Sequence, residues 1–141
     1  MERIVIFDFY RTIYNPDSSS LVQGANEILE ELKSRGYRLF LLSYGEWGRQ
    51  SLIEDLGIAD RFEKILVTTQ KTEQEFQELL RGVPGSKEVF VVGDRIRGEI
   101  KIGRKLGFTT IWVRLEDELL GEEPEPDFAV RNLAEILKIL P

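Results

Sequence analysis

Residues 3–9 read Arg-Ile-Val-Ile-Phe-Asp-Phe, an almost continuous run of β-branched and aromatic residues. The run lacks the alternation of apolar and polar residues expected of a strand with one face in water. It therefore predicts a strand that is buried on both faces, as central strands of parallel sheets are. Asp8 would then lie at the carboxyl end of such a strand.

Strand-like and helix-like patterns alternate on the carboxyl side of this run. Further strands are predicted at residues 37–42, 65–68, 88–92 and 109–113. Helices are predicted from Ser20 to about residue 36, and at residues 46–56, 72–81 and 97–106. Short connections between alternating strands and helices are typical of an α/β fold. We expect a doubly wound parallel sheet of five main strands with helices on both faces, in a single domain spanning residues 1–141.

Local signals refine the element boundaries. Ser20 with Gln23, and Thr72 with Glu75, each fit a capping box at a helix start. Residues 118–127 contain two prolines and several acids and predict a solvated loop. Residues 128–130 fit a short edge strand, and the apolar spacing from Leu133 to Leu140 predicts a closing amphipathic helix.

The composition excludes several classes of protein. The 141-residue chain has neither cysteine nor histidine, so disulfides, thiolate metal sites and histidine-activated nucleophiles are ruled out. Its net charge of -6 argues against a protein that coats nucleic acid. No apolar stretch is long enough to cross a membrane, and the first residues lack the pattern of a signal peptide. We expect a cytoplasmic protein without a membrane partner.

Candidate functional residues stand at the ends of the predicted strands, because ligands of doubly wound sheets bind beyond the carboxyl ends of the strands. These residues are two carboxylates, two hydroxyls and a lysine: Asp8, Ser43, Thr69, Lys71 and Asp94. Carboxylate oxygens suit a hard divalent cation, while a lysine and hydroxyl groups suit a phosphoryl group.

The order of these residues resembles the motifs of the haloacid dehalogenase-like (HAD) hydrolase family. Ile6-Phe7-Asp8-Phe9-Tyr10-Arg11-Thr12 stands where the family has Asp-x-Asp-x-Thr, and Leu41-Leu42-Ser43 stands where it has its second motif. Lys71 matches the third motif, and the stretch beginning Gly93-Asp94 matches the acidic fourth motif. The ending from Pro126 to Leu137 is also similar, so the resemblance covers essentially the whole chain.

The resemblance implies a phosphoryl-transfer site. Asp8 would attack phosphorus and form an acyl phosphate, which water then cleaves. Mg²⁺ would be bound by Asp8, Asp94 and the backbone carbonyl of Tyr10, and would offset the repulsion between the carboxylates and the phosphate. Lys71 would add a further positive charge.

Three supporting residues follow from the same resemblance. Ser43 would donate a hydrogen bond to the transferring oxygens, Glu99 would orient Lys71 or a metal-bound water, and Thr12 would hold the motif loop in shape. Each assignment has a plainer alternative. Ser43 could cap a helix, Lys71 could be an exposed side chain, and Glu99 could belong to a solvated helix face.

Several residues near these motifs are candidates for binding the rest of a substrate. Arg11, Arg95 and Arg97 lie in the motif loops and could bind an anionic substrate, or they could simply be solvated. Trp47 could be a platform for substrate or part of the core.

Tyr10 is the main departure from the family's pattern, because it replaces the aspartate that serves the phosphatases as general acid and base. General acid-base help is worth about 10²–10⁴-fold, so a phosphatase without it should be slow. The family's 2-haloacid dehalogenases carry a tyrosine at this position, which makes a dehalogenase one alternative. A catalytically weak protein that binds a phosphorylated ligand or a partner is another.

The predicted connections leave no room for a substantial cap domain, since residues 14–20 alone separate the first motif from the next helix. An uncapped site is open to water and can admit a bulky group. We therefore expect a phosphorylated small molecule or macromolecule as the partner, and a monomer or homodimer as the assembly.

Overall fold

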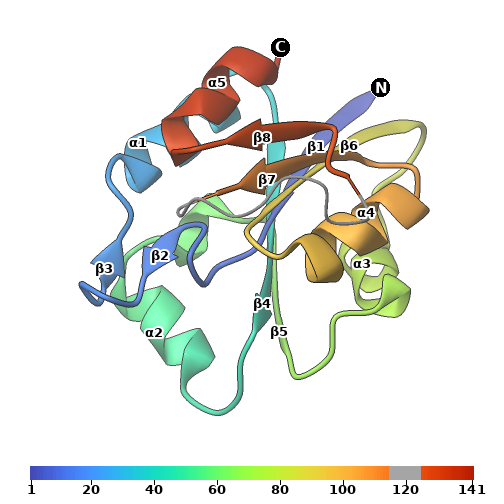
Figure 1. Ribbon diagram of the computed structural model, residues 1–141. Helices are drawn as coiled ribbons and strands as arrows, with labels where there is room; N and C mark the ends of the chain where they lie inside the picture. The colour runs from blue at the N-terminus through green and yellow to red at the C-terminus, as the bar shows by residue number, and fades with distance from the viewer. Residues whose placement is uncertain (115–124) are drawn as a thin grey trace.

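A computed structural model of the chain describes residues 1–114 and 125–141. Its centre is a parallel sheet with the strand order β5-β4-β1-β6-β7-β8, shown in Figure 1. The strands are β1 (Glu2–Phe7), β4 (Arg38–Tyr44), β5 (Lys64–Thr68), β6 (Lys87–Gly93), β7 (Thr109–Val113) and β8 (Phe128–Val130). The predicted parallel sheet is confirmed, and the short edge strand pairs in parallel with β7 as its sixth member.

Helices cover both faces of this sheet, as predicted. On one side are α1 (Ala25–Ser34), α2 (Arg49–Asp55) and α5 (Ile136–Ile139), and on the other are α3 (Glu73–Leu80) and α4 (Lys101–Lys105) (Figure 1). Three short helical turns complete the order: η1 (Ala59–Arg61), the π-helical segment η2 (Ile96–Ile100) and η3 (Leu133–Glu135).

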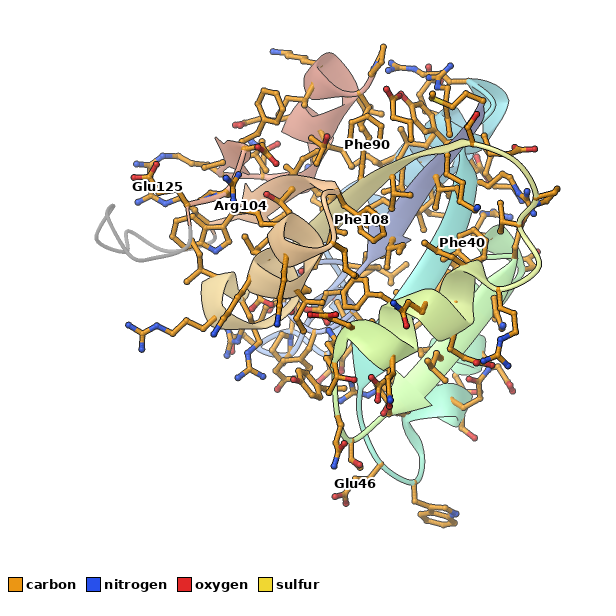
Figure 2. All side chains as sticks on the ribbon, turned by 90° about the vertical axis from the view of Figure 1, so that its right-hand side faces the viewer. Phe40, Glu46, Phe90, Arg104, Phe108 and Glu125 are labelled. Atoms are coloured by element: carbon orange, nitrogen blue, oxygen red, sulfur yellow. The ribbon has the colours of Figure 1, made fainter. Side chains whose placement is uncertain are left out.

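Successive residues of β1 face opposite sides of the sheet and divide the core in two. Val5 and Phe7 belong to the core under α1, while Ile4 and Ile6 pack with Phe76 of α3. All four strand residues are at most 1% exposed, which explains why the sequence shows no polar alternation there. Figure 2 shows the same division, with Phe40 and Phe108 on the side of α3 and α4.

The predicted start of the first helix, at Ser20, is wrong. A hairpin of β2 (Tyr14–Asn15) and β3 (Ser20–Leu21) occupies this segment, and α1 begins only after Gly24. Ser20 pairs with Asn15 across the hairpin and its hydroxyl bonds that of Ser18, so it is not available to cap a helix. Serine suits turns as well as caps. The second capping box, Thr72 with Glu75, is confirmed at the start of α3.

This hairpin is also the whole insertion between β1 and α1. Within the two described ranges, no substantial cap domain covers the sheet, in agreement with the prediction. Residues 118–124 of the predicted solvated loop lie outside the described residues. No helix in the described part of the chain is long and apolar enough to cross a membrane.

Candidate active site

Asp8 directly follows β1, and its backbone N–H still donates to Val92 of β6, at 2.9 Å. The central strand therefore fixes the position of this side chain, which is 4% exposed. The Lys71 Nζ atom donates to Asp8 Oδ1 at 2.5 Å, and Thr12 Oγ1 lies 3.5 Å from Asp8 Oδ2. Lys71 follows β5 and precedes the capped start of α3. Because β1 and β5 lie on either side of β4, the contact between Asp8 and Lys71 joins the ends of two strands that are not neighbours.

Asp94 and Glu99 approach the same point from the loop after β6. Carboxylate oxygens of Asp8, Asp94 and Glu99 all lie within 4.8 Å of one another. Glu99 is 2% exposed, and its Oε2 atom is 3.6 Å from Lys71 Nζ. We call Asp8, Lys71, Asp94 and Glu99 the charge cluster.

The backbone around Glu99 is shaped to admit its side chain. A Cβ atom at Gly93 would lie 2.2 Å from Glu99 Oε1, so no other residue leaves this space free. The same Oε1 atom accepts a hydrogen bond from the N–H of Arg95, at 3.1 Å. Trp112 of β7 donates its indole N–H to the carbonyl of Asp94, at 3.0 Å, and packs with Ile96. The loop after β6 is thus held from both sides.

Burial and mutual repulsion perturb the acids of the charge cluster. Burial, and then the neighbouring Asp8, raise the pKa of Asp94 to about 8. Burial and Asp8 likewise raise the pKa of Glu99, to about 7. Burial alone would lower the pKa of Lys71, but attraction to Asp8 and Glu99 outweighs it and the pKa is raised. The cluster thus combines three carboxyl groups with one lysine, and the repulsion among the carboxylates favours protons on Asp94 and Glu99.

The charge cluster fits a hard divalent cation. Asp94 Oδ1 and Glu99 Oε2 are buried, and neither has a hydrogen-bond partner among the described residues. Buried carboxylate oxygens without partners are costly unless a cation satisfies them. The donors are oxygens alone, which Mg²⁺ prefers.

Ser43 is the last buried residue of β4, with none of its surface exposed, so it does not cap a helix. Its hydroxyl donates to the carbonyl of Tyr44 and accepts from Arg49 Nη1, both at 2.9 Å. Arg49 also donates to the Tyr44 carbonyl and lies over the rings of Phe9 and Tyr10. Arg49 was not among the predicted site residues, because an arginine in the first turn of α2 has no motif to mark it.

A pocket of about 350 Å³ opens above Asp8. Its lining combines acids, arginines and aromatic residues: Asp8, Tyr10, Tyr44, Gly45, Arg49, Asp94 and Arg95. The predicted site residues Asp8, Tyr10, Asp94 and Arg95 thus share one cavity. Lys71 lies behind this cavity, where its Nζ atom contacts Asp8 and forms an ion pair with Glu99. Neither Lys71 nor Glu99 is therefore the solvated side chain of the plainer alternatives.

Other predicted residues lie elsewhere. Arg11 has a left-handed backbone conformation with φ 62°, pairs with Asp17 at 3.8 Å and lines a different pocket beside the hairpin. Thr69 is exposed after β5. Arg97 lines a groove between α3 and α4. Trp47 is fully exposed, so its assignment to the core is wrong; it follows Glu46, whose loop extends away from the sheet in Figure 2.

The sequence pattern that describes haloacid dehalogenase-like hydrolases matches residues 5–113. No curated protein matches the sequence itself. The chain is 26% identical to YfnB from Bacillus subtilis, whose crystal structure contains magnesium; the match has a TM-score of 0.76 and covers 85% of this chain and 56% of YfnB.

Two further solved structures match almost end to end and show the same fold. A HAD phosphatase from Thermococcus onnurineus has a TM-score of 0.84 at 15% identity, covering 99% of this chain and 98% of that one. A 2-haloacid dehalogenase from Pseudomonas syringae has a TM-score of 0.82 at 15% identity, with the same coverage. The proteins that share this fold thus include both a phosphatase and a dehalogenase.

Proposed function

The chain belongs to the haloacid dehalogenase-like hydrolase family, and we propose that it is a Mg²⁺-dependent phosphohydrolase acting through an aspartyl phosphate. The observation that carries this proposal is the buried contact between Lys71 and Asp8, beside Asp94 and Glu99, each of which has one buried oxygen without a hydrogen bond among the described residues. A carboxylate held by a lysine, next to a place for a dication, is suited to attack a phosphate dianion.

In this proposal Asp8, Asp94 and the backbone carbonyl of Tyr10 hold the metal ion. The family generally uses Mg²⁺, and the acidic cluster supplies oxygen donors of the required kind. Mg²⁺ bound there offsets the negative charge of the acids and of the phosphate, and polarises the phosphoryl group.

The chain's own residues then carry the displacement. An Asp8 oxygen forms a bond to phosphorus as the bond between phosphorus and the leaving oxygen breaks, and water later hydrolyses the acyl phosphate. Lys71 keeps Asp8 in position and offsets part of the charge that gathers there. Glu99 accepts from the Arg95 N–H and faces Lys71, so it fixes the lysine's position. For Ser43 to donate to a phosphate oxygen, its hydroxyl must turn away from Tyr44.

Hydrolysis of p-nitrophenyl phosphate tests the proposal, because its leaving group needs little protonation. We expect turnover with Mg²⁺, loss of turnover in EDTA, and a loss of roughly 10³-fold or more in Asp8→Asn. Trapping of phosphate on Asp8, detected by mass spectrometry after acid quenching, would identify the intermediate. Equal rates in EDTA or in Asp8→Asn would refute the enzymatic assignment.

Tyr10 predicts which substrates are slow. It lines the pocket with Asp8 and takes the place of the family's carboxylic acid, so alkyl phosphates, whose leaving groups need a proton, should be poor substrates. We expect Tyr10→Asp to raise kcat on an alkyl phosphate by about 10²-fold and to change kcat on p-nitrophenyl phosphate much less. An unchanged ratio of the two rates in the folded variant would show that Tyr10 does not occupy the acid's place.

Tyr10 also supports a second candidate, a 2-haloacid dehalogenase, since a halide leaves without a proton. Asp94 and Glu99 each have a buried oxygen without a hydrogen bond in the described structure, which favours the metal-dependent reaction over this one. Chloride release from 2-chloropropionate in the presence of EDTA would reverse that preference. A protein that only binds a phosphorylated ligand would release no product in either assay.

A further inference from the structure

The pocket above Asp8 contains two arginines, Arg49 and Arg95, that form no ion pair among the described residues. Within residues 1–114 and 125–141, no carboxylate lies within 4.0 Å of the guanidinium of Arg49 or of Arg95. Six other arginines each do have such an acid: Arg11, Arg35, Arg38, Arg61, Arg81 and Arg104. In a chain of net charge -6, two arginines that line one small cavity and form no ion pair among the described residues mark a place for an anion.

The Tyr44 ring lies near both the inner cation, Lys71, and Arg95. The Lys71 Nζ atom is 4.7 Å from the centre of the Tyr44 ring, and the Arg95 guanidinium is 5.2 Å from it. The Lys71 side chain has no exposed surface, whereas Arg95 is exposed. Lys71 forms ion pairs with Asp8 and Glu99. In the proposed function it therefore acts on the phosphoryl group next to Asp8, at the bottom of the pocket. The charge of Arg95 is left for a group nearer the mouth.

Arg49 approaches the same cavity from the start of α2. Its guanidinium lies 5.5 Å from the centre of the Tyr10 ring, and its hydrogen bonds go to the uncharged oxygens of Ser43 and Tyr44. These bonds fix the orientation of the arginine without balancing its charge. The Arg95 side chain runs past Gly98, where a Cβ atom would lie 3.2 Å from Arg95 Cβ and 3.9 Å from Arg95 Nε.

We propose that Arg49 and Arg95 form a second anion-binding subsite, which selects phosphate monoesters whose leaving group carries another negative charge, such as a carboxylate or a second phosphate. This inference rests on the proposed function, since the subsite is defined relative to a phosphate at Asp8. The rings of Tyr10 and Tyr44 provide the apolar surface between the two anions. Arginine suits such a site because its planar fork binds a carboxylate or phosphate in two places.

Two matched ligands that the protein cannot hydrolyse test the subsite apart from turnover. Benzylphosphonate and 4-carboxybenzylphosphonate differ by one carboxylate, and their affinities can be measured calorimetrically with Mg²⁺ present. We expect the wild-type protein to prefer the carboxylated ligand by about tenfold, the low end for a charge-assisted contact near solvent. Arg95→Gln should abolish most of the preference, by weakening the binding of 4-carboxybenzylphosphonate much more than that of benzylphosphonate, and Arg49→Gln should reduce the preference.

Lys101→Gln is the matched control, because Lys101 is a cation of α4 that lines the neighbouring groove and not this pocket. It should retain the preference. Equal affinity of the wild-type protein for the two ligands, or an undiminished preference in Arg95→Gln, overturns the subsite. Failure to bind either ligand overturns both the subsite and the proposed function. A retained preference without turnover of any phosphate ester overturns the proposed function alone.

Discussion

The charge cluster and Asp127 are two places where carboxylates meet the sheet, and their oxygens are satisfied in opposite ways. Asp127 precedes β8, and its Oδ2 atom accepts from the backbone N–H of Thr110 at 2.8 Å while Oδ1 accepts from Arg104 at 2.9 Å. Its own N–H donates to the Thr110 hydroxyl. In the charge cluster, by contrast, Asp94 and Glu99 each have a buried oxygen for which the described residues supply no hydrogen bond.

This difference separates a structural acid from a functional one. Asp127 has every partner it needs within the chain, so it ties the segment before β8 to β7 and needs no ligand. The charge cluster collects three acids around Lys71 and leaves part of their charge unbalanced, which costs stability. A fold retains such a cluster where a bound cation or substrate completes it.

The largest expected effect on the free energy of unfolding comes from replacing Lys71, the buried cation of the charge cluster. Replacing Lys71 with methionine keeps most of the side-chain volume but leaves the three acids of the cluster without a buried cation. Breaking a buried ion pair costs roughly 3–5 kcal/mol. We expect the free energy of unfolding, measured by urea titration at pH 8 in EDTA, to fall by about this amount. Part of the loss should be recovered at pH 6, where Asp94 and Glu99, with pKa values of about 8 and 7, are more protonated.

Lys105→Met is the control for Lys71→Met. Lys105 pairs with Glu73 at 3.0 Å, a normal ion-pair distance, but its side chain is 71% exposed. Exposed pairs contribute at most about 1 kcal/mol, so this variant should unfold almost as the wild-type protein does. Equal losses in the two variants would show that burial does not distinguish the cluster from surface ion pairs.

A smaller loss is expected on the structural side of the comparison. Asp127→Ala removes the acceptor of the buried Thr110 N–H, and a buried donor without a partner costs about 1–3 kcal/mol. The free energy of unfolding should fall by this amount, while the Mg²⁺ dependence of turnover stays unchanged. Asp17→Ala, which removes a mostly exposed acid paired with Arg11, should have a clearly smaller effect. A changed Mg²⁺ requirement in Asp127→Ala would contradict the structural assignment.

Much of the fold and the core of the site could be predicted because the chain carries them locally. Residues 3–9 identify the central strand by their unbroken apolar run, and the ends of such strands place Asp8 and Asp94 at one edge of the sheet. The Thr72–Glu75 capping box is a contact within one helical turn, so its sequence signature was sufficient. The position of Lys71 next to that helix followed directly.

The features that were missed depend on contacts between distant segments. Ser20 could equally cap a helix or form a turn, and pairing with Asn15 decided for the hairpin. Arg49 acquires its place from Ser43 and from the rings of Phe9 and Tyr10, and no spacing in its own segment records these contacts. Asp127 does lie in the predicted loop, but its hydrogen bonds were missed, since its partner Thr110 lies 17 residues earlier.

The smallest and most discriminating effect on the free energy of unfolding concerns Asp94. Replacing its carboxyl group with an amide should stabilise the metal-free protein. The pKa of this acid is raised in the fold to about 8, so the folded chain binds more protons than the unfolded chain between about pH 4 and pH 8. The stability associated with its protonated form is fully present below the unfolded pKa and is lost as the pH rises through 8. An asparagine side chain cannot ionise, so Asp94→Asn should remove this loss.

At pH 8 in EDTA, we therefore expect Asp94→Asn to unfold with a free energy higher than that of the wild-type protein by about 1 kcal/mol. The order should reverse with Mg²⁺. The wild-type protein should gain stability from Mg²⁺, and gain more at pH 8 than at pH 6, since the ion must displace fewer protons there. Asp94→Asn should gain little at either pH. A variant less stable than the wild-type protein in EDTA would mean that Asp94, like Asp127, is satisfied by the chain itself, and the distinction between the two acidic places would no longer hold.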